Sequence, residues 1–464
     1  MKNPTRLLKL PPRSPGWILP FCKLAIANTA SNLMVPLAGL IDTAFLGHLD
    51  SIRHLNGVAI ASIIFNVIYW SFNFFRMGTT GPVAQAVGRG EQATVWLIGV
   101  RNTLLALVAG LLILLLHQPI AALGFGLLEA GPGVRAAAIA FYNGRILGAP
   151  AVLINFVLLG WLLGRSQGRQ VMLLAVVGNG SNIALDYWFI QRLGLESYGA
   201  GLATALSQYI MLAAGVGLLC YEGIPWALWA QIRPRLWQTD ALRSLFSLNR
   251  DILIRTFALV IAMSLFTNFS SGLGEAVLGV NTLLLQVFLM SAHFMDGIAI
   301  AVESYAGQFY GRQAKTDLTW LLLFGSGASV ALGTAIALVL MIWPKALFGL
   351  LTRHDSLLNQ VPVYLPWLLP VLCFGAVAFV LDGYFLGLTA SRTLRKFTLW
   401  AVGVGYLPMA IAAVWLRNAH LLWLALASLM IARSVTLGWQ VNFPTLLAAG
   451  ATKEKATVRR GPSL

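Results

Sequence analysis

Long apolar stretches follow one another along most of this chain. A helix needs about 20 apolar residues to cross the hydrocarbon core of a bilayer, so each stretch is a candidate transmembrane span. Only 10% of the residues are charged, whereas a soluble domain carries about 25%. The sequence therefore predicts an all-α integral membrane protein with twelve transmembrane helices. We draw the spans at 17–46, 56–87, 94–116, 134–163, 171–190, 199–221, 251–272, 276–310, 317–343, 359–388, 397–416 and 420–448.

The basic residues of the loops predict an orientation. With the N-terminus in the cytoplasm, most lysines and arginines between the spans fall on the cytoplasmic side, as the positive-inside rule requires. The formal charge of +16 is then explained by these loops, and we expect no nucleic-acid partner. We predict a monomeric, multi-pass protein of the cell inner membrane with both ends inside.

Two motifs recur at one constant spacing along the chain. The pattern Gln-x-x-Gly-Arg that begins at Gln85 and ends the second span returns at Gln308, at the end of the eighth. A Gly-x-x-x-Gly motif that begins at Gly160 in the fourth span returns at Gly383 in the tenth. The difference in residue number is the same for both pairs, and we call it the repeat offset. Such a parallel repeat predicts two pseudo-symmetric six-helix lobes related by an axis along the membrane normal. The expected parts are a tail 1–16, an N-lobe 17–221, a cytoplasmic linker 222–250, a C-lobe 251–448 and a tail 449–464.

Two carboxylates are embedded in the spans of the first lobe. Asp42 lies near the end of span one and Asp186 near the end of span five. A charge in hydrocarbon costs about 2.5–3.5 kcal/mol on insertion scales, so it is kept where it has a partner or a task. Both spans run outward and both acids lie about one turn from the outer end, so we expect them to meet. Pro36 removes a backbone donor and is placed to kink the helix below Asp42.

Further oxygen ligands accompany the two aspartates. Asn179 and Asn182 precede Asp186 at helical spacing, and Asn155 and Thr204 lie in the neighbouring spans. Hard cations bind such oxygens, and a carboxylate beside another acid also carries a proton readily. We therefore predict a site for a coupling ion, Na⁺ or H⁺, with no other cofactor or metal. The alternative is that the acids pair with basic or amide groups and only hold helices together.

The second lobe has its own embedded acids. Asp296 and Glu303 share one face of span eight, and Asp382 lies in span ten. They are expected to line a cavity that binds a cationic substrate, or to form a second ion site. The alternative is that they pair with Arg255 or Arg76, or line a watery vestibule.

No constellation for chemistry appears in the sequence. The three cysteines fall in separate apolar segments without metal-ligand spacing, and there is neither a catalytic triad nor an ATPase motif. We expect a protein that is not an enzyme and that draws its energy from an ion gradient.

Four motifs together resemble the multidrug and toxic compound extrusion (MATE) family, more closely its DinF-like branch. They are GLIDTAFLGH at 39–48, NGSNIALD at 179–186, DGIAIAVESYAGQ at 296–308 and LDGYFLG at 381–387. The resemblance implies a rocker-switch exporter driven by H⁺ or Na⁺. It also implies that a first-lobe polar network binds the ion and that the first helix bends at Pro36 when its aspartate is protonated. The residues onto which this network carries over are Asp42, Asp186, Asn182, Asn155 and Thr204.

Three functions remain to be weighed. The first is an ion-coupled antiporter that exports organic cations or lipophilic compounds. The second is a flippase for lipid-linked precursors from the wider superfamily, which would need a basic central cleft. The third is a membrane enzyme or an assembly scaffold. We favour the first because the embedded residues are mostly acidic.

Overall fold

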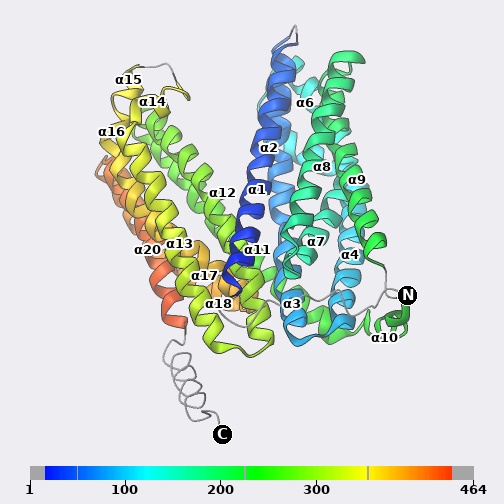
Figure 1. Ribbon diagram of the computed structural model, residues 1–464. Helices are drawn as coiled ribbons and strands as arrows, with labels where there is room; N and C mark the ends of the chain where they lie inside the picture. The colour runs from blue at the N-terminus through cyan, green and yellow to red at the C-terminus, as the bar shows by residue number, and fades with distance from the viewer. Residues whose placement is uncertain (1–15, 50, 224–225, 353–354, 442–464) are drawn as a thin grey trace, which may run out of the picture. The chain divides into compact units, whose positions relative to one another are not determined.

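The computed structural model describes residues 16–441 except 50, 224–225 and 353–354, and all of its regular structure is helical (Figure 1). The predicted tail 449–464, and all but the last residue of the tail 1–16, lie outside the described residues. The helices of the first half are α1 Ile18–Gly47, α2 Arg53–Phe72, α3 Phe74–Arg89, α4 Gln92–Leu115, α5 His117–Gly126, α6 Pro132–Ile146, α7 Ala149–Gly164, α8 Gly168–Asp186, α9 Glu196–Glu222 and α10 Trp229–Ile232. Those of the second half are α11 Thr239–Gly272, α12 Glu275–Gly311, α13 Lys315–Ile342, α14 Pro344–Phe348, α15 Asp355–Leu358, α16 Val361–Tyr364, α17 Leu368–Gly387, α18 Ser391–Trp400, α19 Leu407–Trp415 and α20 Ala419–Gln440.

The lengths and compositions of these helices confirm a polytopic membrane fold. Among the described residues, ten helical segments are long and apolar enough to span a bilayer, and α6 with α7, bent by 53°, makes an eleventh. The remaining predicted span coincides with α8. Asn179, Asn182 and Asp186 lower the hydropathy of this helix, which explains why it does not pass the same test. The count of twelve therefore stays a prediction.

The chain divides into two compact units by its contacts. Unit 1 contains Ala30–Asn249, and unit 2 contains the described residues up to Thr29 together with those from Arg250 onward. The division falls inside two helices, because α1 changes unit after Thr29 and α11 changes unit after Asn249. The first turns of α1 thus belong with the second unit, whereas the predicted N-lobe began at residue 17.

Unit 1 is built on close helix contacts. Helix α9 lies beside α6 and α8, and α7 lies beside α3 and α4 (Figure 1). Glycines allow these approaches, since a Cβ on Gly201 would meet the backbone of Phe141 and of Arg145 on α6. A buried aromatic core that includes Phe65, Phe141 and Tyr142 fills the space between α2 and α6. This packing fixes the helices that bear the embedded polar residues.

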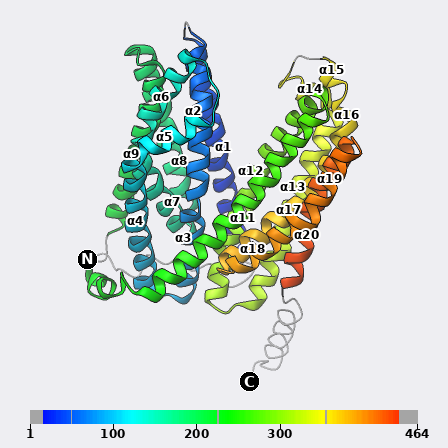
Figure 2. The ribbon, with the colours of Figure 1, turned by 180° about the vertical axis from the view of Figure 1, so that it is seen from behind.

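Unit 2 packs α12 against α17 and α13, with α20 beside α17 (Figure 2). The first turns of α1 join this unit through edge-to-face aromatic contacts. The ring of Phe21 lies 5.8 Å from that of Phe324, and the ring of Trp17, directly before α1, lies 5.8 Å from that of Phe309. Aromatic pairs in this geometry contribute about 0.5–1.5 kcal/mol each beyond the burial of their area. The start of α1 is therefore firmly part of unit 2.

The internal repeat is visible in the contacts. A Cβ on Gly164 of α7 would approach Thr80 O on α3 at 2.8 Å. A Cβ on Gly387 of α17 would approach Gly307 N on α12 at 2.9 Å. The contact between α7 and α3 in unit 1 therefore has its counterpart between α17 and α12 in unit 2. The helix ends repeat as well. Left-handed residues follow α3 and α12 at positions 90 and 313, and follow α7 and α17 at positions 166 and 389. Both pairs are separated by the repeat offset of the sequence motifs.

Candidate functional site: a polar cavity in the first unit

A cavity of about 790 Å³ lies inside unit 1, enclosed by α1, α2, α6, α7, α8 and α9. Its lining combines apolar side chains with amides, hydroxyls and two charged groups. Among the lining residues, the only carboxylate is that of Asp42 and the only cation is that of Arg145. The predicted site residues on this wall are Asp42, Asn155, Asn179, Asn182 and Thr204.

The two first-unit aspartates meet beside this cavity. Asp186 is fully buried, Asp42 is half-buried, and a side-chain hydrogen bond joins their carboxyl groups. Asn182 donates from Nδ2 to Asp186 Oδ2 at 3.0 Å. The Oδ1 atom of each carboxyl group is buried without a donor among the described amides and hydroxyls. A contact between two carboxyl groups needs a proton between them, because two carboxylates at this separation repel.

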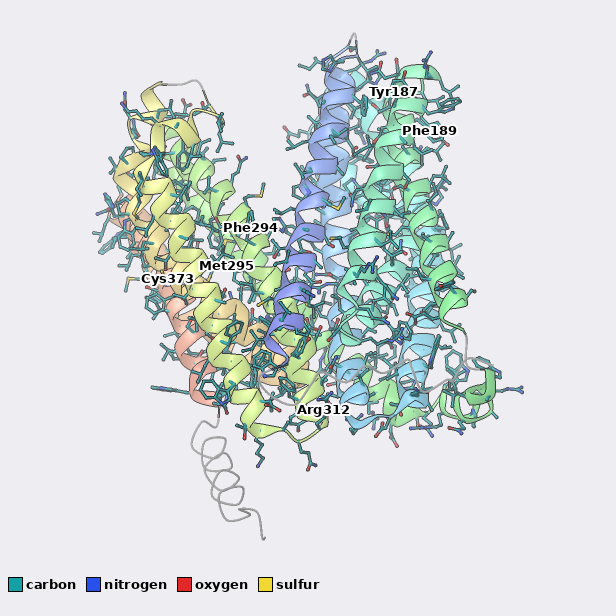
Figure 3. All side chains as sticks on the ribbon, in the orientation of Figure 1. Tyr187, Phe189, Phe294, Met295, Arg312 and Cys373 are labelled. Atoms are coloured by element: carbon teal, nitrogen blue, oxygen red, sulfur yellow. The ribbon has the colours of Figure 1, made fainter. Side chains whose placement is uncertain are left out.

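The local fold around Asp186 explains its place. Asp186 is the last residue of α8, and a π-helical turn, Tyr187–Arg192, follows it directly. Figure 3 labels Tyr187 and Phe189 in this turn. Such π-helical turns are rare and often occur at functional sites.

The other predicted ligands use their donors inside the protein. Asn155 Nδ2 donates to Gln208 O at 2.9 Å and to Gln208 Oε1 at 3.1 Å. Thr204 Oγ1 donates to the carbonyl oxygen of Ala200, and Asn179 Nδ2 donates to that of Ala175. The Oδ1 atom of Asn155 is buried and has no partner among the described residues. The cavity wall thus presents oxygen acceptors from α7, α8 and α9.

Pro36 lies within α1, one and a half turns before Asp42. The helix is continuous through it, from Ile18 to Gly47. Asp42 therefore shares a helix with a residue that leaves one carbonyl without its backbone donor. Pro36 itself is not among the residues that line the cavity.

Arg145 is the residue that sequence reasoning missed. Its guanidinium carbon lies 4.6 Å from the ring centroid of Phe65, 5.5 Å from that of Phe141 and 5.8 Å from that of Tyr69. It interacts electrostatically with Asp42 but forms no salt bridge with a described residue. A signal existed, since an arginine inside an apolar span is as unusual as an aspartate there.

The bend between α6 and α7 positions Arg145. Pro150 stands in the first turn of α7 and cannot donate to a carbonyl of the preceding turn. The helix therefore breaks, and Arg145 falls in the last turn of α6, just before the 53° bend. A cation is favoured there by the helix dipole.

The second-unit acids lie in a different setting. Asp382 on α17 is bonded through Oδ2 by Arg255 on α11 and by Arg433 on α20, and all three residues are buried. Pairing with Arg255 was the alternative to a substrate-binding role for Asp382, and the geometry matches that alternative. Arg433 was not foreseen. Glu303 is buried on α12, and Asp296 is half-buried on the same helix.

Among the described residues, no group of three or more His, Cys, Asp or Glu side chains could hold a metal ion. Figure 3 labels Phe294 and Met295 on α12, directly before Asp296. The apolar side chains of Phe294 and Met295 are thus followed directly by Asp296, and Glu303 lies two turns further along α12.

The family of the chain is evident from comparisons with known proteins. The MatE family model matches residues 29–188 and 252–411, and the starts of the two matches are separated by the repeat offset. The chain is 35% identical over 422 residues to the DNA damage-inducible protein F of Escherichia coli strain K12, covering 89% of this chain and 90% of that protein. It is 23% identical to a probable multidrug resistance protein NorM of Thermotoga maritima, covering 89% of each.

Solved structures agree on the fold. A MOP superfamily transporter from Pyrococcus furiosus matches with a TM-score of 0.83 at 20% identity, covering 96% of this chain and 99% of that one. The two copies of the family model, the DinF-like relative and the shared fold confirm the predicted resemblance. The chain belongs to the MATE family of multidrug efflux transporters, and within it to the DinF-like branch.

Proposed function

We propose that this protein is an ion-coupled antiporter of the inner membrane that exports lipophilic organic cations by alternating access. The coupling ion binds at the carboxyl pair formed by Asp42 and Asp186, and the cargo binds in the adjoining cavity. The loop charges support an orientation with both ends in the cytoplasm.

The observation that carries the proposal is the contact between the two carboxyl groups. Two ionised carboxylates would repel strongly in this buried position, so the pair retains a proton when no other cation is present. Na⁺ would have to replace that proton and recruit further oxygens, of which Asn155 Oδ1 offers one. We therefore favour H⁺ over Na⁺ as the resting occupant.

The cavity supports a small-molecule cargo. Its volume of about 790 Å³ falls within the range of about 300–1,000 Å³ that is typical of ligand sites. Phe141, Phe156 and Tyr69 supply aromatic surface, and aromatic faces attract organic cations. A cationic cargo and a proton would then compete for the charge of the same carboxyl pair, which is the linkage that antiport requires.

Helix α1 connects the ion site to a conformational change. In the proposed cycle, protonation of the pair weakens the electrostatic attraction between Asp42 and Arg145, and α1 bends at Pro36, where one backbone hydrogen bond is already missing. The bend would alter the cavity wall that Asp42 and Gly39 contribute.

The flippase alternative receives less support. A pyrophosphate headgroup calls for several converging cations, whereas Arg145 is the only cation among the residues that line the cavity. The acid Asp42 also interacts electrostatically with Arg145.

Transport in inverted membrane vesicles tests the proposal. Uptake of a cationic dye is measured with a proton gradient and a sodium gradient imposed separately, on the parent protein and on Asp42→Asn. We expect proton-driven uptake in the parent protein and none in Asp42→Asn, with both proteins present at equal levels in the membrane.

A matched control is available in the same unit. Glu129 is exposed in the segment between α5 and α6, so Glu129→Gln removes a carboxylate without touching the cavity. It should transport normally. Proton-driven uptake that persists in Asp42→Asn would refute the assignment of the coupling site.

A further inference from the structure

The cavity of unit 1 holds a cation whose effect on the cargo the proposed coupling cycle leaves unspecified. Arg145 lines the same cavity as Asp42, and its Nε is buried without a partner among the described residues. Burying a guanidinium is costly, so its charge must be balanced by groups nearby. Its positive charge has therefore to be counted together with those of the two carboxyl groups.

The position of Arg145 is fixed by aromatic rings rather than by an ion pair. Phe65, Phe141 and Tyr69 surround the guanidinium at 4.6–5.8 Å from its central carbon. Phe65 and Phe141 also pack against each other edge to face, with ring centroids 6.1 Å apart. Stacking on aromatic faces stabilises a cation without neutralising it. Arg145 is therefore a fixed positive charge that remains available to oppose other cations in the cavity.

Few other ionisable groups surround this charge. Asp42 on α1 is the acid that interacts with it, and Asp186 at the end of α8 interacts in turn with Asp42. The remaining titratable neighbours are phenols, which are neutral at physiological pH: Tyr69 on α2, Tyr142 on α6 and Tyr209 on α9. The net charge of the cavity therefore depends on the two carboxyl groups, Arg145 and whatever is bound.

The charges of the two carboxyl groups and Arg145 add up to zero when the carboxyl pair binds one proton. Two carboxyl groups that share one proton carry a net charge of −1, and Arg145 carries +1. If a monovalent cation enters and that proton leaves, the sum is again zero. If a divalent cation enters, only one proton is available to leave, and an unbalanced positive charge remains in a poorly hydrated site.

From this balance we propose that Arg145 limits the cavity to one exchangeable positive charge, so that the cargo is a monovalent lipophilic cation and dications are excluded. The inference rests on the proposed function, and it adds the charge class of the cargo. Arg145 acts as a specificity residue through its fixed charge. The buried, unpartnered Asn155 Oδ1 and the ring of Phe156 supply the uncharged contacts for such a cargo.

Calorimetry on the purified, detergent-solubilised protein tests this inference with two flat aromatic probes of similar shape. N-methyl-phenylpyridinium carries one positive charge and methyl viologen carries two. Titrations in buffers that differ in ionisation enthalpy count the protons released per bound probe. We expect the parent protein to bind the monocation at least about tenfold more tightly than the dication, and to release one proton.

Substitution of Arg145 should abolish this preference. In Arg145→Gln, two protons occupy the carboxyl pair at neutrality, so the dication should gain about tenfold or more in affinity and displace both. Arg145→Lys keeps the charge and should keep the discrimination. Arg135→Gln is the matched control, because Arg135 is exposed on the same helix and does not line the cavity.

Three results would overturn the inference: equal affinities for the two probes in the parent protein, an unchanged preference in folded Arg145→Gln, or no binding of either probe to the parent protein. Arg145→Lys keeps the test decisive if Arg145→Gln does not fold, since loss of discrimination in the lysine variant would also refute a role for the charge. These outcomes are separate from the vesicle experiment. In the vesicle experiment, a wrong assignment of the coupling site would show as proton-driven uptake that persists in Asp42→Asn, whatever the charge of the cargo.

Discussion

Asp382→Asn separates a structural role from a substrate-binding role for the second-unit acids. In the structure, Asp382 Oδ2 accepts hydrogen bonds from Arg255 Nη2 and Arg433 Nη2, and it joins α11, α17 and α20 at one point. The side chains of the three residues are only 2–8% exposed. The carboxylate is thus the charge that balances two buried guanidinium groups.

The expected loss is large. An asparagine keeps the shape of the side chain but removes the negative charge, so both arginines remain buried without a counter-charge. Breaking a buried ion pair by removing one partner costs about 3–5 kcal/mol. We place this variant in the upper half of that range because one carboxylate serves two cations. Unfolding of the protein in detergent, followed by heat or by denaturant, measures the difference.

A charge-free replacement of the whole cluster provides the internal check. The triple variant Arg255→Met, Asp382→Leu and Arg433→Met removes all three charges, and it should recover most of the lost stability. Glu275→Gln is the surface control, because Glu275 is exposed in the first turn of α12 and its charge contributes at most about 1 kcal/mol there. Normal stability of Asp382→Asn combined with lost cargo binding would contradict this account and would make Asp382 a cargo ligand.

Two further predictions concern helix packing and helix ends. Gly164→Ala should cost about 1–3 kcal/mol of folding free energy in the same unfolding assay, because the added Cβ would lie 2.7 Å from Val83 Cβ. Its control is Gly180→Ala, in open space on α8, which should be neutral or stabilising by up to about 1 kcal/mol. Equal effects of the two substitutions would refute the packing argument. Gln313→Gly should raise the melting temperature, because Gln313 is exposed and has a left-handed φ of +58° after α12. Glycine removes a left-handed penalty of about 1–2 kcal/mol, which is partly offset by the larger backbone entropy that glycine loses on folding. A lowered melting temperature would show that Gln313 makes contacts worth more than this strain.

The sequence was informative wherever a feature is local or repeated. Span positions depend on about 20 consecutive apolar residues, and the repeat offset depends on motifs that end helices, so both could be predicted. The break in the fourth span was not located from the sequence: 134–163 was drawn as one helix, yet α6 and α7 are bent by 53° next to Pro150. The sequence also did not indicate that α1 is divided between the two compact units after Thr29. The packing partners that decide this lie far along the chain and leave no local signal.

The site was predicted by residue type but not by charge balance. Asp42, Asn155, Asn179, Asn182 and Thr204 could be named because embedded polar residues are rare, and they line one cavity with Asp186 behind it. Their functional roles stay predictions. Arg145 and Arg433 were overlooked because most basic residues were counted for the orientation of loops and not for burial inside spans. Arg145 and Arg433 became informative only once their acidic neighbours were known.

The two units use the same helix framework for opposite charge balances. At the repeat offset, Asp42 corresponds to Leu265, Arg145 to Leu368 and Asp382 to Leu159, so neither cluster has a counterpart in the other unit. In unit 1, two acids face one arginine beside a cavity, which leaves capacity for a bound cation. In unit 2, two arginines bond one acid, and no such capacity remains at Asp382. Because cation binding requires a site that is short of positive charge, this asymmetry favours unit 1 as the place where ions are exchanged and leaves the unit 2 cluster a structural role.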